Sequence, residues 1–209
     1  MVTGRIVDLS QPVGEGTPVY PGDGPVLVSS IGGASVNVSR IELSVHTGTH
    51  MDAPFHFFED AETIDRIGLE RCMGPARLID VRDVVAGGEI RREHIEGRLI
   101  APLRGHAAIL HTGWSRHWNA ANYFTEHPCL SGDAAQFLVD AGVLFVGVDM
   151  PSVDRAPYPA HRVLLRAGVP IVENLTNLDS IGSDVFEMIV LPVKLLGRDG
   201  APVRAVAVV

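Results

Sequence analysis

The stretch Val143-Leu-Phe-Val-Gly-Val148 is apolar at both odd and even positions, and so is Met188-Ile-Val-Leu191. Successive side chains of a strand point to opposite faces of the sheet. A run without polar positions therefore predicts a strand that is covered on both faces. These two runs predict a sheet that lies between other layers of a globular domain.

Short strands joined by tight turns are predicted on either side of these runs. The sequence holds 22 Gly and 14 Pro, and these residues interrupt regular structure. From Val36 to His46 the apolar positions change parity, which predicts a bulge or turn near Ser39–Arg40. The predicted strands are Gly4–Leu9, Val26–Ser30, Ala76–Val81, Ala107–His111, Val143–Asp149, Ile171–Asn174, Glu187–Leu195 and Val203–Val209.

Helices are fewer than strands. Ser131 is a favourable N-cap for a helix over Gly132–Ala141, and Gly142 suits the residue that follows its C-terminus. A second helix over Pro159–Ala167 is predicted to end at Gly168, and helical turns are expected near residues 63–71 and 91–97. We therefore predict one domain over residues 1–209, of mixed α/β (α+β) class, strand-rich with few short helices.

Composition and charge exclude several classes of protein. The 209 residues include 17 Lys and Arg against 25 Asp and Glu, which gives a net charge of −8. This balance argues against nucleic acid or an anionic membrane as the main partner. The apolar runs are too short to span a bilayer, and Asp8 interrupts the region where an export signal needs an apolar core. We therefore expect a cytoplasmic protein, whose two cysteines, Cys72 and Cys129, are unpaired thiols.

Nine histidines stand out in this composition, because histidine is the commonest metal ligand and titrates near neutral pH. Three of them fall in the segment Val45-His-Thr-Gly-Thr-His-Met-Asp-Ala-Pro-Phe-His56. The β-branched threonines, the glycine and the proline of this segment disfavour a helix. We expect a strand that runs into a sharp loop, in which Gly48 lets His46 and His50 converge.

Asp52 adds a carboxylate oxygen to these two imidazoles. A His/His/Asp set suits a catalytic divalent metal such as zinc or manganese, with one position left open for water. The alternative is a polar loop whose histidines are only hydrogen-bonded to their neighbours. The remaining histidines are expected to be scattered surface residues, apart from His161.

His161 and Glu173 belong to the same hypothesis. His161 lies at the start of the predicted second helix, and Glu173 shares parity with Val169 and Ile171 on a predicted strand. The Glu173 carboxylate is thus expected on an apolar face, where a metal or another cation normally compensates its charge. The alternatives are a surface histidine and a buried ion pair.

The segment resembles the signature HxGTHxDxPxH of the cyclase-like metal-dependent hydrolases, which include bacterial kynurenine formamidase (arylformamidase) and isatin hydrolase. The resemblance extends over nearly the whole chain. Other matching segments are Pro21-Gly-Asp23, Cys72-Met-Gly-Pro75, His111-Thr-Gly-Trp114, Gly147-Val-Asp149 and Ile171–Leu178. It implies a swivelling β/β/α domain and a homodimer or homotetramer. The chain departs from the kynurenine formamidases at Tyr20, where they carry tryptophan.

The resemblance also implies roles for individual residues. His46, His50 and Asp52 would bind a first metal, and Asp52 would bridge to a second metal held by His161 and Glu173. The implied cofactor is Zn²⁺, as two ions, or Mn²⁺. His56 would be the catalytic residue that transfers protons.

The implied reaction is hydrolysis of an aryl formamide, such as N-formylkynurenine to kynurenine and formate, by a metal-bound hydroxide. Tyr20, Phe57 and Trp114 are candidate contacts for this small aromatic amide substrate. The segments GxSxG and HExxH are absent, so neither a serine nucleophile nor that zinc motif is indicated. Two alternatives are a hydrolase of a cyclic amide such as isatin and a non-catalytic module that binds a metal or a small molecule.

Overall fold

The computed structural model describes residues 4–33, 35–99 and 101–209, and it confirms the strand-rich α+β class. The strands are β1 (Ile6–Asp8), β2 (Leu27–Ser30), β3 (Ser39–Glu42), β4 (His50–Asp52), β5 (Met73–Asp80), β6 (Glu89–Ile90), β7 (Ala107–His111), β8 (Cys129–Leu130), β9 (Val146–Val148), β10 (Ile171–Glu173), β11 (Val185–Pro192) and β12 (Gly200–Val208). The α-helices are α1 (Arg92–Glu96), α2 (Gly132–Ala141) and α3 (Pro159–Arg166). Among the described residues, none of these helices is long and apolar enough to cross a bilayer.

The main sheet closes on itself like a barrel. Its order is β12-β11-β5-β7-β9-β10-β4, and β4 completes the ring because it pairs with both β10 and β12. β5, β7, β9 and β10 run parallel, whereas β4, β11 and β12 join antiparallel to their neighbours, and β1 is added on β12. The short strand β4 is thereby held on both of its edges.

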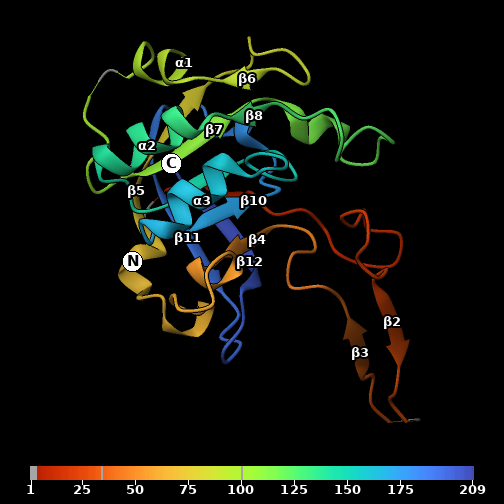
Figure 1. Cartoon of the computed structure of the whole chain (residues 1–209). Helices are drawn as coiled ribbons and strands as arrows, with labels where there is room; N and C mark the ends of the chain where they lie inside the picture. Colours follow the sequence, from red (N-terminus) through yellow and green to blue (C-terminus); the bar gives the residue numbers. More distant parts are fainter. Residues whose placement is uncertain (1–3, 34, 100) are drawn as a thin grey trace.

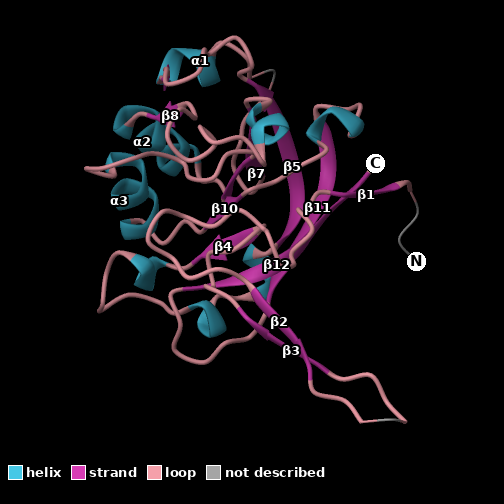
Figure 2. Cartoon of the chain, turned by 90° about the vertical axis from the view of Figure 1, so that its right-hand side faces the viewer, coloured by secondary structure: helices cyan, strands magenta, loops and turns pink. Residues whose placement is uncertain are grey.

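The three helices stack on one side of this sheet, whereas the β2–β3 hairpin extends away from it (Figures 1 and 2). One apolar core, which includes Leu138, Leu164 and Val148, lies between the helices and the sheet. A second core on the opposite face includes Met51 and Val172. Met51, the middle residue of β4, points into this second core. Because side chains alternate along a strand, its neighbours His50 and Asp52 point to the helix side.

Most predicted elements are confirmed to within three residues at each end. The strand predicted at 143–149 is β9, whose three residues are all buried. The prediction of a bulge or turn near Ser39–Arg40 is wrong, because both residues pair in unbroken register with β2. The strand residues of this hairpin are all exposed, so no buried face fixes the parity of its apolar positions. Both cysteines are free, and burial raises the pKa of Cys72 to about 11.

One local prediction is wrong in its order. We expected a strand that ran into a sharp loop at Gly48, but the turn comes first and the strand begins after it, at His50. Gly48 does make the turn, with a φ of 67°. The strand depends on its pairing with β10 and β12, and no local pattern in the sequence reports that pairing.

The N-cap of α2 gives a stability prediction. Ser131 Oγ accepts a hydrogen bond from the Ala134 N–H over 3.0 Å. Ser131→Ala is expected to lower the free energy of unfolding by about 1 kcal/mol, because this N–H loses its partner. Urea denaturation measures the change. Ser29→Ala, on exposed β2, serves as the control, and equal stability of the two variants would contradict the prediction.

Candidate metal and active site

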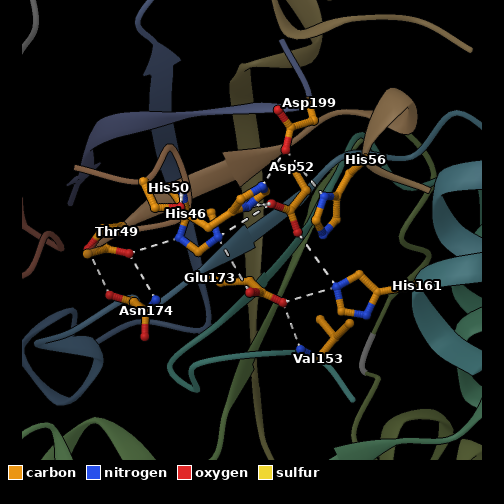
Figure 3. A network of polar contacts seen from close by, with 12 residues as sticks. His46, Thr49, His50, Asp52, His56, Val153, His161, Glu173, Asn174 and Asp199 are labelled. Carbon is orange, nitrogen blue, oxygen red and sulfur yellow. Dashed lines mark hydrogen bonds and ion pairs between the residues drawn. The ribbon is translucent and has the colours of Figure 1, made fainter. Parts of the chain in front are cut away.

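The histidine-rich segment 45–56 lies on the wall of a cavity of about 300 Å³ between β4, β10 and the start of α3. All five predicted metal ligands line this cavity, together with the predicted catalytic residue His56. Tyr20 and Phe57 also line it. In Figure 3 the site side chains point toward one another from separate segments of the chain.

Strand register places three carboxylate and imidazole groups on one face. His50 and Asp52 are two residues apart on β4, so both side chains point to the helix side. Glu173 on β10 pairs directly with His50 across the sheet. All three are almost completely buried, and the carboxylate of Glu173 faces the imidazoles of His50 and His161.

The turn before β4 brings in His46. The turn favours glycine at position 48 because of its positive φ, and a Cβ there would lie 2.5 Å from Val13 Cγ2, so the exposed Val13 side chain would have to move. The turn is held by Asn174, whose Nδ2 donates to the Gly48 carbonyl over 2.9 Å. As a result His46 Nδ1 lies 2.8 Å from Asp52 Oδ1.

α3 brings His161 to the same place, and Asp154 orients its ring. His161 Nδ1 lies 2.6 Å from Asp154 Oδ1, so Nε2 faces Asp52 and Glu173. The ring of His50 is oriented in the same way, because its Nδ1 donates to the Gly48 carbonyl over 2.9 Å. A metal-binding histidine typically has such a partner on its second nitrogen.

The spacing of these donor atoms fits a divalent metal. Donors around a tetrahedral metal with bonds of about 2.1 Å lie about 3.4 Å apart. His50 Nε2 lies 3.4 Å from Asp52 Oδ1 and 3.5 Å from Glu173 Oε2. His161 Nε2 lies 3.6 Å from Asp52 Oδ2 and 3.4 Å from Glu173 Oε1. Asp52 and Glu173 therefore each direct one carboxylate oxygen toward His50 and the other toward His161.

The carboxylates make the site strongly attractive to positive charge. Burial acts to lower the pKa of His46, but Asp52 and Asp199 outweigh it and raise this pKa to about 10. Burial likewise opposes protonation of His161, whereas hydrogen bonds to Asp154, Asp52 and Glu173 raise its pKa. Burial alone would raise the pKa of Asp52, but the neighbouring imidazoles lower it well below its usual range. In the metal-free protein, protons on His46 and His161 therefore balance the buried carboxylates.

Metal affinity is therefore expected to rise with pH. Because the pKa of His46 is about 10, its imidazole is protonated at neutral pH and a metal must displace that proton. Zinc titration by calorimetry in two buffers of different ionisation enthalpy should show proton release. The apparent Kd should fall steadily between about pH 6.5 and about pH 8.5. A Kd that stays constant over this range would contradict the prediction.

His56 differs from the other histidines of the site. It follows Pro54 in a single 3₁₀ turn directly after β4, and burial lowers its pKa. Its ring lies 4.2 Å from that of His46, between centroids, at the cavity wall. A ring that is neutral at pH 7 is able to accept a proton.

Among the predicted substrate contacts, the structure separates Trp114 from the other two. Trp114 is buried, its indole N–H donates to the Tyr123 carbonyl over 2.9 Å, and it is not among the residues that line the cavity. Phe124 lines the cavity instead, and its ring packs edge-on against that of Tyr20. The position of Trp114 does not support a substrate contact.

Sequence reasoning missed other members of the site and misplaced two histidines. Asp154, Asn174 and Asp199 bond to the ligand histidines or to their turn, but they lie outside any recognisable spacing pattern. His111 and His127 are buried, so the expectation that they lie at the surface is wrong. His111 is the last residue of β7, whose five residues are all buried, and His127 Nδ1 donates to the Pro128 carbonyl over 2.8 Å.

Comparisons with known proteins show the family of this chain. A family model described as "Putative cyclase" matches residues 7–155. A kynurenine formamidase from Bacillus cereus is 38% identical over 99% of this chain and 98% of its own. A solved structure described as a potential metal-dependent hydrolase with cyclase activity is 32% identical, covers 97% of this chain and 96% of its own, and has a TM-score of 0.84. Isatin hydrolase A from Labrenzia aggregata, bound to benzyl benzoate, is 26% identical with a TM-score of 0.87 and covers 98% of this chain and 93% of its own.

Proposed function

Because the chain belongs to the cyclase family, we propose that it is a metal-dependent arylformamidase that hydrolyses N-formylkynurenine to kynurenine and formate. It is a hydrolase of carbon–nitrogen bonds other than peptide bonds. One observation carries the finer proposal. The buried donors from β4, β10 and α3 meet at a cavity that also has an aromatic wall.

We assign the metal site to His46, His50, Asp52, His161 and Glu173, with two Zn²⁺ or one Mn²⁺. Asp52 and Glu173 each present separate oxygens to His50 and His161, which supports the bridging role of Asp52. A divalent metal lowers the pKa of a coordinated water from about 15.7 to about 7 and polarises a carbonyl group. The buried carboxylates supply the negative charge that such an ion requires.

His56 transfers the protons of the reaction. Its neutral ring accepts a proton from the attacking water and then donates one to the leaving aniline nitrogen as the carbon–nitrogen bond breaks. Hydrolysis then produces one formate and one amine from one water molecule. The lowered pKa of His56 supports this role, since the ring starts the cycle without a proton.

Tyr20 and Phe57 bind the aromatic ring of the substrate. They lie on the cavity wall, and Phe57 stacks on the His161 ring with centroids 4.9 Å apart. An aryl group placed against this wall would bring its formyl group toward the buried donors. Phe124 extends the same wall beside Tyr20.

Opening of a cyclic amide is the second candidate activity. The similarity to isatin hydrolase A favours it, since the two chains share the fold over nearly their full lengths. Isatin is itself a fused aromatic ring system with a reactive carbon–nitrogen bond, so the same wall and donors would serve it.

Formate release from N-formylkynurenine, compared with ring opening of isatin, tests the proposal. The protein is assayed as purified, after removal of metal with a chelator, and after addition of Zn²⁺ or Mn²⁺. Activity on the formamide that disappears with the metal and returns with it is the expected result. Isatin turnover alone would favour the second candidate, and tight metal binding without turnover would favour a non-catalytic module.

Other parts of the proposal rest on the family resemblance and on the sequence. They are the swivelling β/β/α description, one domain over residues 1–209, assembly as a homodimer or homotetramer, and a cytoplasmic location. Size-exclusion chromatography with light scattering would test the assembly.

A further inference from the structure

We propose that Asp199 is a positioning residue of the active site, whose Oδ2 holds the rings of His46 and His56 in one arrangement. The inference rests on the proposed function, because it takes His46 as a metal ligand and His56 as the proton carrier. Asp199 lies 143 residues beyond His56 along the chain, in the turn between β11 and β12, outside the ligand signature.

Pairing of β12 with β4 places Asp199 rigidly. Its carbonyl accepts a hydrogen bond from the Ala53 N–H over 2.8 Å, and the next residue, Gly200, is the register partner of Asp52. A Cβ at Gly200 would lie 2.9 Å from the Met51 carbonyl oxygen and 3.1 Å from His46 Cε1. The glycine therefore permits a close approach that brings the Asp199 backbone directly beside the ligand strand.

A single carboxylate oxygen of Asp199 reaches both histidines. Asp199 Oδ2 lies 2.7 Å from His46 Nε2 and 3.5 Å from His56 Nδ1 (Figure 3). The two imidazole rings lie side by side, with centroids 4.2 Å apart. One carboxylate oxygen thus contacts both His46, the proposed metal ligand, and His56, the proposed proton carrier.

The orientation of His46 explains what this contact does. Its Nδ1 faces Asp52 Oδ1 at 2.8 Å, on the side of the other donors, while Nε2 faces Asp199 on the opposite side. A carboxylate on the outer nitrogen sets the tautomer and the angle of a ligand imidazole, and it makes the inner nitrogen a stronger donor. Asp154 makes the corresponding contact with Nδ1 of His161. The imidazoles of His46 and His161 therefore each have a carboxylate on the outer nitrogen.

Asp199 acts through these rings rather than on the substrate. It is not among the residues that line the cavity. Its loss should therefore weaken metal binding and lower kcat, whereas KM should stay within about twofold of the wild-type value. A substrate contact would change KM instead.

The matched control is Asp65. Its Oδ1 accepts a hydrogen bond from the Gly197 N–H over 2.8 Å, so it supports the same β11–β12 turn without contacting a histidine of the site. Asp65→Asn removes a carboxylate charge beside the same turn but keeps an acceptor for the Gly197 N–H, so it reports any effect of charge near the turn that does not act through the histidines. Asp199→Asn keeps an acceptor for the histidines but removes the charge, and Asp199→Ala removes both.

The test measures zinc Kd by competition with a chromophoric chelator, zinc stoichiometry, and kcat and KM with N-formylkynurenine. Asp199→Ala is expected to weaken metal binding by about 10- to 100-fold, Asp199→Asn less, and Asp65→Asn not at all. Wild-type Kd and kcat in Asp199→Ala would overturn the proposal. So would an equal loss in Asp65→Asn, or the loss of one whole zinc equivalent, which would make Asp199 a direct ligand.

Different results would contradict the proposed function and the proposed role of Asp199. A wild-type protein that binds zinc but releases no formate would remove the proposed function. The shift in zinc Kd between Asp199→Ala and Asp65→Asn would still show whether Asp199 positions His46. Normal wild-type turnover with unchanged Asp199 variants would remove the inference alone.

Discussion

Asp52→Asn is expected to abolish formamide hydrolysis, with kcat/KM reduced by at least about 1,000-fold. Asp52 is almost completely buried, and its two oxygens face His50 on one side and His161 on the other. Asparagine would replace one of these oxygens by an NH₂ group, which repels a cation. The site would also lose one of the two negative charges that balance a metal at its centre.

Metal content and turnover together measure this effect. Asp52→Asn should retain less zinc after dialysis than the wild-type protein, and its activity should not return when zinc is added. Asp140→Asn, which removes an exposed carboxylate on α2, is the control for general effects of the substitution. Circular dichroism shows whether the variant is folded. A folded Asp52→Asn protein with wild-type activity would refute the assignment.

His56→Ala is expected to lower kcat by about 10²- to 10⁴-fold, which is the usual contribution of a positioned general acid or base. The substitution leaves the five assigned metal ligands in place, so zinc stoichiometry should not change. Loss of rate without loss of metal would separate proton transfer from metal binding. The pH dependence of kcat should also lose the ionisation that belongs to the neutral His56 ring.

His117→Ala is the control for His56, because this exposed histidine lies outside the cavity. Its activity should match the wild type. If His56→Ala keeps a wild-type kcat, another group must carry the proton. If it loses zinc in proportion to activity, His56 is a ligand and the division of roles is wrong.

Local patterns in the sequence predicted many of the elements. Ser131 and Gly142 bracket α2 as expected, because capping depends on the residues at the two ends of the helix itself. The apolar run at 143–148 contains β9, which pairs with β7 and β10 and whose three residues are all buried. Patterns of this kind depend only on residues close together in the sequence, so they predict an element without knowledge of the rest of the chain.

The order of turn and strand around Gly48 could not be predicted in the same way. The three residues of β4 have no preference for a strand strong enough to identify it, and two of them are ionisable. They form a strand because β10 and β12 supply hydrogen bonds to both of its edges. Those partners lie more than 110 residues away along the chain.

The sequence by itself was enough to predict the chemistry proposed for this protein. The spacing of His46, His50 and Asp52 predicted a metal-ligand set, because residue type and short spacing indicate which donors can converge. The tertiary structure alone decided which groups support that set. The Asp199 carboxylate reaches His46 only because β12 pairs with β4. Such contacts depend on distance in space, which the linear order of residues does not contain.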